Sequence, residues 1–190
     1  MKIHMILLAA GFGSRFGSNK LLYPVDGKAM YRHTMDLMVK LVGEFEEADA
    51  AVVTRYEEIA EEAKRQGAAC LINHHSEQGI SSSMQTGLRA RLEDEAYYLF
   101  FTADQPRLKM ATVKAFLCQF FESGKGIGCV SKQGTPKNPC VFHSRYAGEL
   151  LSIRGDRGGK QVVLRHPEDV FLFEAGEEET EDIDTPDDFV

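Results

Sequence analysis

Residues 3–20 read Ile3-His4-Met5-Ile6-Leu7-Leu8-Ala9-Ala10-Gly11-Phe12-Gly13-Ser14-Arg15-Phe16-Gly17-Ser18-Asn19-Lys20, and this stretch decides the fold. Its first half is an apolar run that ends at a glycine, a pattern typical of a buried strand in a parallel sheet. The glycines of its second half allow tight turns and bring backbone amides close to a ligand. Arg15 and Lys20 add positive charge to the same loop. Backbone amides, an arginine fork and a lysine together favour a polyphosphate ligand.

The spacing within this loop excludes two common phosphate-binding motifs. A dinucleotide fingerprint requires Gly-x-Gly-x-x-Gly, and Phe16 occupies the place of its third glycine. A Walker loop requires Gly-Lys followed by Ser or Thr, and two residues separate Gly17 from Lys20. A glycine-rich surface loop without a ligand is the plain alternative, but the preceding strand and the two cations favour a phosphate loop of another kind.

The pattern Leu8-Ala9-Ala10-Gly11-x-Gly13-Ser14-Arg15-x-Gly17-x-x-Lys20 resembles the signature loop of nucleotidyltransferases that activate sugars, isoprenoid precursors and pterin cofactors. Within that superfamily it resembles the MobA-like branch, and most closely the molybdenum cofactor cytidylyltransferases. The resemblance implies that Lys20 and Arg15 are catalytic and hold the leaving pyrophosphate. It also implies a nucleotide-binding set in this loop, made of Leu8, Ala9, Ala10, Gly11, Gly13, Ser14, Arg15 and Lys20.

Composition narrows the classes of partner. The 190 residues include 22 basic and 29 acidic side chains, which gives a formal net charge of −7. This balance argues against a general nucleic-acid-binding or anionic membrane-binding surface. The four cysteines form no Cys-x-x-Cys pair, and no apolar run approaches the length of a membrane span, about 20 residues. We expect a cytoplasmic protein with no nucleic-acid or membrane partner.

Strand and helix patterns alternate along the chain. After the first strand, apolar runs predict strands over 49–54, 68–73, 97–103, 127–131 and 170–173. Amphipathic patterns predict helices over 29–42, 56–66, 82–92, 110–122 and 145–153. Such alternation implies right-handed crossovers and a mostly parallel sheet. We therefore predict the α/β class, with residues 1–190 forming a single domain of three layers, α/β/α, Rossmann-like and similar to nucleotide-diphospho-sugar transferases.

Asp104 ends a strongly apolar strand and is followed closely by Pro106. As a structural residue it would cap the helix near Met110 or begin a turn. As a ligand it would hold Mg²⁺, which prefers one or two carboxylates together with phosphate oxygens and water. The sequence Asp104-Gln105-Pro106 stands where the MobA-like family has its metal-binding aspartate, so we expect Asp104 to be catalytic and to bind Mg²⁺.

The acidic C-terminal stretch 174–188 is a solvated or frayed tail in the plainest interpretation. Its segment Asp182-Ile183-Asp184-Thr185-Pro186-Asp187-Asp188 nevertheless matches an Asp-x-Asp-Thr-Pro-x-Asp motif of the same family. Helix capping alone would also explain an aspartate before Thr-Pro. The resemblance implies that Asp184 is the second metal ligand.

Two further segments resemble the family. Gly79-Ile80-Ser81-Ser82-Ser83 resembles its Gly-Met-Ser-Ser-Ser stretch, so Gly79, Ser82, Ser83 and the nearby Asn73 are candidate nucleotide contacts; N-capping is the structural alternative. Thr135–Phe142 and Gly155–Lys160 resemble the part of these enzymes that meets the second substrate. There Arg157 and Lys160 would face an anionic acceptor, although the second segment also reads as a turn.

The sequence thus predicts a magnesium-dependent transfer of a nucleoside monophosphate from an NTP to a phosphorylated acceptor, with release of pyrophosphate. By resemblance the nucleotide is CTP and the acceptor is molybdopterin that carries molybdenum, with a molybdoenzyme or its chaperone as a further partner. The alternatives are a guanylyltransferase on the same cofactor, a transferase for a sugar phosphate or phosphoalcohol, and a non-catalytic nucleotide-binding accessory protein.

Overall fold

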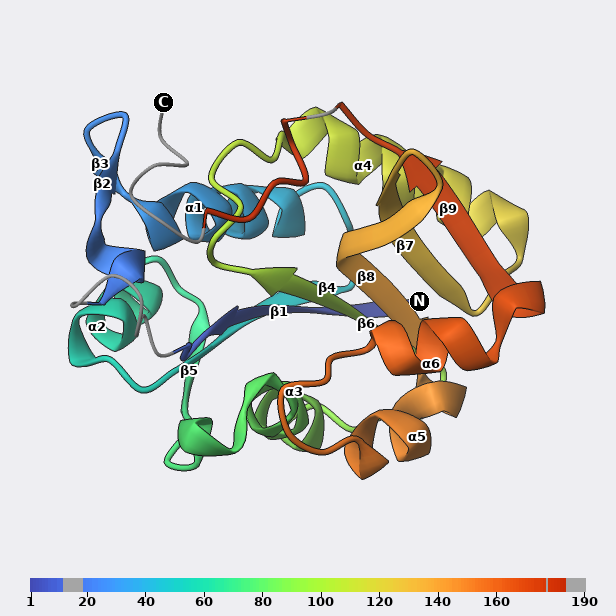
Figure 1. Cartoon of the computed structure of the whole chain (residues 1–190), viewed down its shortest axis with the longest axis horizontal. Helices are drawn as coiled ribbons and strands as arrows, with labels where there is room; N and C mark the ends of the chain where they lie inside the picture. Colours follow the sequence, from blue (N-terminus) through green and yellow to red (C-terminus); the bar gives the residue numbers. More distant parts are fainter. Residues whose placement is uncertain (12–18, 177, 184–190) are drawn as a thin grey trace.

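A seven-stranded sheet forms the centre of the computed structural model, which describes residues 1–11, 19–176 and 178–183 (Figure 1). The strands are β1 (Lys2–Ala9), β4 (Ala48–Thr54), β5 (Ala69–Ile72), β6 (Ala96–Thr102), β7 (Ile127–Lys132), β8 (Thr135–His143) and β9 (Val170–Glu174). They lie in the order β5-β4-β1-β6-β8-β7-β9. Only β8 runs against its neighbours β6 and β7, so the mostly parallel sheet predicted from the sequence is confirmed.

The central position of β1 follows from its composition. The strand pairs in parallel with β4 on one side and β6 on the other. Both of its faces are covered, and Met5, Ile6 and Leu7 have no exposed surface. A strand covered on both faces needs a continuous apolar run rather than an alternating one, which is what residues 3–10 supply.

Helices cover both faces of the sheet and give the predicted three layers (Figure 1). One face packs against α1 (Met30–Val42), α2 (Glu57–Arg65) and α4 (Met110–Ser123). The other packs against α3 (Ile80–Arg89), α5 (Ala147–Ser152) and α6 (Lys160–Arg165). Neighbouring side chains of one strand go to opposite cores, as period-two alternation requires: Val52 belongs to the first and Val53 to the second.

A small hairpin separates β1 from the first long helix. Lys20–Leu22 form one 3-10 turn, η2, and β2 (Pro24–Val25) then pairs antiparallel with β3 (Lys28–Ala29). Its two turn residues, Asp26 and Gly27, both have positive φ, 47° and 76°. This is the backbone of a tight two-residue hairpin, for which Asp-Gly is a favoured sequence.

In the second half of the chain, α4, β7 and β9 confirm the predicted elements, and the region between β7 and β9 departs from them. The strand β8 and the helix α6 were not predicted, and the helix predicted over 145–153 is a 3-10 turn over 144–146 followed by α5. Two prolines in Thr135–Phe142 argue against a strand in the sequence, because proline lacks the N–H that an inner strand uses for pairing. The pattern therefore did not predict β8. Cys129 of β7 pairs with Cys140 of β8, but the next residue, Val130, pairs with Lys137. Residues 138 and 139 are therefore left out of the pairing, and Pro139 lies in this irregularity.

The stretch after β9 returns across the loop that follows β6 (Figure 1). A Glu179 carboxylate oxygen accepts a hydrogen bond from the Lys109 amide at 3.3 Å, and Gln105 donates to the Thr180 carbonyl at 3.3 Å. Glu179 and Thr180 are buried. The interpretation of this acidic stretch as a solvated tail is therefore wrong for Glu179, Thr180 and Ile183, which are buried, whereas residues 178, 181 and 182 are exposed. Among the described residues, no helix is long and apolar enough to cross a membrane.

Candidate active site

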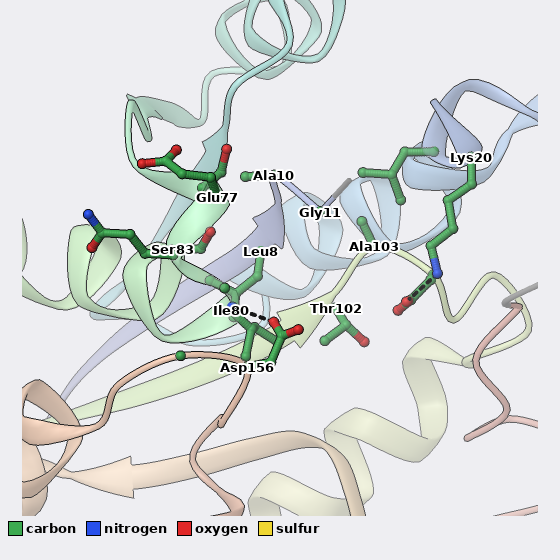
Figure 2. Close-up of a pocket in the computed structure, with 16 residues that line it drawn as sticks. Leu8, Ala10, Gly11, Lys20, Glu77, Ile80, Ser83, Thr102, Ala103 and Asp156 are labelled. Carbon is green, nitrogen blue, oxygen red and sulfur yellow. Dashed lines mark hydrogen bonds and ion pairs between the residues drawn. The ribbon is translucent and has the colours of Figure 1, made fainter. Parts of the chain in front are cut away.

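A cavity of about 500 Å³ opens at the carboxyl ends of β1 and β6, where an open α/β sheet collects its ligands (Figure 2). Its described lining comes from five regions: the end of β1, the 3-10 turn η2, the start of α3 with its preceding turn, the loop after β6, and the loop at residues 155–156. These contribute Leu8, Ala10, Gly11, Lys20, Leu21, Ser76, Glu77, Gln78, Gly79, Ile80, Ser83, Thr102, Ala103, Asp104, Gly155 and Asp156.

Lys20 and Asp104 meet at one side of this cavity, as Figure 2 shows for the lysine. The Lys20 ammonium lies 3.0 Å from Asp104 Oδ2 and also donates to the Ile183 carbonyl at 3.2 Å. The Ile183 amide in turn donates to the Asp104 carbonyl at 3.0 Å. The structure thus brings together residues that lie more than 80 positions apart, and it carries the chain up to Ile183 beside the pair.

The second carboxylate oxygen of Asp104 has a different environment. Asp104 Oδ1 is buried and has no hydrogen-bond partner among the described residues. Asp104 does not cap α4 either, because Lys109 stands at that cap position and the cap has no side-chain hydrogen bond. The capping alternative for Asp104 is therefore wrong. An unsatisfied buried carboxylate oxygen needs an explanation, and a bound cation is one that fits a carboxylate.

The start of α3 forms the opposite side of the cavity, where Figure 2 shows Ser83 and Glu77. Gly79 adopts φ +89°, and a Cβ on it would lie 2.6 Å from the Gly155 backbone. Glycine is thus required at position 79 both by its backbone angle and by the close approach of the 155–156 loop. That loop is fastened to the helix: the Ile80 amide donates to Asp156 Oδ1 at 3.3 Å.

Two candidate nucleotide contacts brace this side rather than line it. Asn73 is buried and donates at 2.9 Å to the hydroxyls of both Ser82 and Ser83. The Ser82 hydroxyl donates to the Gly79 carbonyl at 2.9 Å. Gly79 and Ser83 line the cavity, whereas Asn73 and Ser82 are absent from its described lining. Asn73 holds two serines of α3 in place, a role that the sequence pattern did not indicate.

The end of the first strand is fixed from behind. Ala9 is fully buried, and its carbonyl accepts from Thr54 Oγ1 at 2.9 Å. The Tyr56 hydroxyl donates to the Gly11 carbonyl at 2.8 Å. Burial raises the pKa of Tyr56, so the phenol stays protonated and able to donate. Leu8, Ala10 and Gly11 line the cavity, while Ala9 supports them from the core.

The predicted residues Gly13, Ser14, Arg15 and Asp184 lie outside the described part of the chain. Arg157 and Lys160, predicted to face the acceptor, are not part of the described lining, and Lys160 is exposed at the start of α6. Their neighbours Gly155 and Asp156 line it instead. Asp156, Glu77 and Thr102 are lining residues that the sequence analysis did not select: Asp156 lies in an irregular loop, Glu77 in a short 3-10 turn over 76–78, and Thr102 at the end of β6.

Solved structures of three proteins illustrate the likeness of this chain to known structures over nearly its whole length. Rv0371c from Mycobacterium tuberculosis H37Rv has a TM-score of 0.78 at 23% identity, covering 100% of this chain and 96% of that one. A second structure of that protein is a complex with manganese. The nucleotidyl transferase Mth528 from Methanothermobacter has a TM-score of 0.79 at 22% identity, covering 99% and 94%. Molybdopterin-guanine dinucleotide biosynthesis protein A from Archaeoglobus fulgidus has a TM-score of 0.66 at 18% identity, covering 98% and 94%.

These likenesses agree in the fold, and at such identities they establish no more than the fold. The sequence itself gives the family, because residues 5–170 match the MobA-like NTP transferase domain. That match includes β1, the lysine of η2 and the aspartate after β6. The chain belongs to the MobA-like NTP transferase family of nucleotidyltransferases.

Proposed function

We propose that the protein transfers CMP from CTP to the phosphate of a pterin acceptor, and that the acceptor is molybdopterin that carries molybdenum. The observation that supports nucleotidyl transfer is the Lys20–Asp104 pair. Lys20 Nζ lies 3.0 Å from Asp104 Oδ2 at the edge of the cavity. A lysine and an aspartate side by side, next to the end of a glycine-bounded strand, are suited to a polyphosphate and its cation.

In this reaction an oxygen of the acceptor phosphate attacks the α-phosphorus of the nucleotide. The new P–O bond forms as the bond between the α-phosphorus and the bridging oxygen breaks, and pyrophosphate leaves. The Lys20 ammonium holds the charge of the leaving group, and Gly11 in the cavity wall contributes a backbone amide to it. Such transfers need little covalent help, since positioning and electrostatics supply most of the rate.

The residues at the cavity fit a divalent cation. Asp104 offers one buried oxygen without a partner among the described residues, and its other oxygen is held by Lys20. We assign Asp104 and Asp184 as the residues that hold Mg²⁺; the second follows Ile183, whose amide bonds to Asp104. A bound Mg²⁺ neutralises phosphate charge. A manganese complex of Rv0371c supports the use of a divalent cation by a similar fold.

The choice of CTP rests on Ala10. Its side chain lines the cavity at the end of β1, where guanylyltransferases of this branch tend to have glycine. The methyl group reduces the space beside the base and favours the smaller pyrimidine. The name of the Archaeoglobus protein supports a molybdopterin acceptor, and a molybdoenzyme or its chaperone would receive the product. A cytoplasmic setting is part of the same proposal.

Pyrophosphate release tests the proposal directly. We expect release when the protein is mixed with CTP, Mg²⁺ and molybdenum-bearing molybdopterin, and its loss in Asp104→Asn. Transfer from GTP in preference to CTP would contradict the choice of nucleotide. Binding of nucleotides without any release of pyrophosphate would instead identify a non-catalytic accessory protein.

A further inference from the structure

Two positive side chains contact the carboxylate of Glu181, a residue close in sequence to the Ile183 that meets Lys20 and Asp104. Lys132 ends β7, and its ammonium lies 2.9 Å from Glu181 Oε1. Arg107 lies in the loop after Asp104, and its Nη1 is 3.8 Å from Glu181 Oε2. Glu181 belongs to the returning segment 178–183, two residues before the Ile183 that bonds to Asp104 and Lys20.

The sheet places a third positive side chain on the same side. Lys137 of β8 is the partner of Val130 on β7, and Lys132 lies two positions beyond Val130 on that strand. Paired residues and residues two apart share one face of a sheet. Val130 packs in the core under α1 and α4, the face across which the segment 178–183 returns. The pKa of Glu181 is lowered first by its hydrogen bond from Lys132, and the charges of Arg107 and Lys137 lower it further.

Glu181 is held at its place by its neighbours rather than by burial. Two residues before it, Glu179 is anchored by the Lys109 amide, and two residues after it, Ile183 is anchored by Asp104. The Glu181 side chain itself is 46% exposed. It can leave the three cations by a change of rotamer while both anchors remain, because exposed long side chains change rotamer readily.

We propose that Arg107, Lys132 and Lys137 form a subsite for the phosphate of the acceptor, and that Glu181 occupies this subsite until the acceptor displaces it. Two cations in contact with one carboxylate, and a third on the same sheet face whose charge acts on it, have the composition of an anion site, and the Glu181 carboxylate stands in the place of the anion. The inference rests on the proposed function, because it assigns the group to the second substrate. In this proposal the second substrate is recognised by Arg107, Lys132 and Lys137 and not by Arg157 and Lys160, the residues expected from the sequence.

The test is a titration of the full chain with inorganic phosphate at constant ionic strength, followed through backbone amide chemical shifts. Removing the competing charge in Glu181→Gln should tighten phosphate binding up to about fivefold, since an exposed ion pair contributes about 1 kcal/mol at most. Lys132→Ala should weaken phosphate binding. In this variant the amide signals of residues 107 and 137 should move less on addition of phosphate than they do in the wild type. The ion pair between Lys114 of α4 and Glu44, which follows α1, supplies the matched controls, Glu44→Gln and Lys114→Ala, which should bind phosphate as the wild type does.

Equal phosphate affinity in Glu181→Gln and wild type would overturn the inference, as would shifts confined to the cavity residues 8–11 and 79–83. The binding of CTP with Mg²⁺ to the same samples separates this result from the proposed function. If CTP binds and the Glu181 variant behaves like the wild type, only the subsite is wrong. If phosphate binds tighter to the variant and CTP does not bind at all, the subsite stands and the nucleotide assignment fails.

Discussion

At the scale of single residues, the ammonium group of Lys20 joins three parts of the chain: the turn after β1, the end of β6 and the returning C-terminal segment. Its side chain is only 15% exposed. A partly buried ion pair contributes little net stability, because desolvation offsets the attraction between its charges. A role toward an anionic substrate therefore explains this pair better than stability does.

Lys20→Ala should therefore lower the rate of pyrophosphate release by about 10²- to 10³-fold, the range found when one charge-stabilising donor is removed. The fold should remain, because the variant removes one side chain at the edge of the cavity. Lys28→Ala is the matched control, since Lys28 pairs with Asp36 on α1 and lies outside the described lining. Steady-state rates with circular dichroism of both variants check the expectation; near-normal turnover in folded Lys20→Ala would remove this lysine from the mechanism.

Ala10 carries a prediction about nucleotide choice. One methyl group in a pocket is worth about 1 to 3 kcal/mol of discrimination. We expect CTP to bind tighter than GTP, and Ala10→Gly to narrow the ratio of the two dissociation constants. Isothermal titration of both nucleotides against both proteins measures this ratio. Tighter GTP binding by the wild type would refute the cytidylyl assignment and leave nucleotidyl transfer in place.

At the scale of elements, α3 lies unusually close to the sheet. A Cβ on Gly87 would stand 2.6 Å from Ile6 Cγ2 on β1 and 3.2 Å from Val53 Cγ2 on β4. This contact sets the position of the helix whose first turn lines the cavity. Gly87→Ala should overpack the interface and cost about 1 to 3 kcal/mol.

Thermal unfolding checks this, with Gly148→Ala as the control. Gly148 also lies in a helix, α5, and nothing stands within 4 Å of a Cβ built there. The control should keep or slightly raise the melting temperature, because alanine restricts the unfolded chain. Equal melting temperatures for the two variants would mean that α3 can move away from β1 at no cost.

Glu174 at the end of β9 holds the turn between β7 and β8. Its carboxylate accepts from Ser131 Oγ at 2.7 Å, from the Gly134 amide at 3.2 Å and from the Gln133 amide. These bonds, led by that of Ser131, lower the pKa of Glu174 below its ordinary value. A carboxylate whose pKa is lower in the folded state stabilises the fold above its unfolded pKa, about 4.3, and loses that contribution as the pH falls through the folded pKa.

Glu174→Gln should therefore have a lower melting temperature than the wild type at pH 7, and the difference should shrink as the pH is lowered below 4. Melting curves over this range measure it. Glu168→Gln, a side chain 72% exposed on the neighbouring turn, is the control and should show little difference at either pH. A difference for Glu174→Gln that is equally large at pH 3 and pH 7 would refute the electrostatic origin.

At the scale of the whole molecule, most strands and helices could be predicted from the sequence, including β6, α4, β7 and β9 in the second half, whereas β8 and α6 could not. Residues 3–10 reveal a doubly covered strand because burial on both faces demands an apolar run. The prolines of β8 conceal a strand because its irregular pairing depends on β7, a partner that no local pattern describes. The site divides in the same way. Lys20 and Asp104 stand in recognisable motifs, whereas Asn73 and Asp156 act through contacts with α3 that only the folded chain creates.

The central claim is that the Lys20–Asp104 side of the cavity binds a nucleotide together with a divalent cation. Isothermal titration of CTP into the wild type and Asp104→Asn, each with and without Mg²⁺, tests it most directly. We predict that Mg²⁺ strengthens CTP binding by the wild type and has no such effect on Asp104→Asn, because the substitution removes the charge that faces the cation. An equal Mg²⁺ dependence in the two proteins, or no binding of any nucleoside triphosphate by the wild type, would contradict the claim.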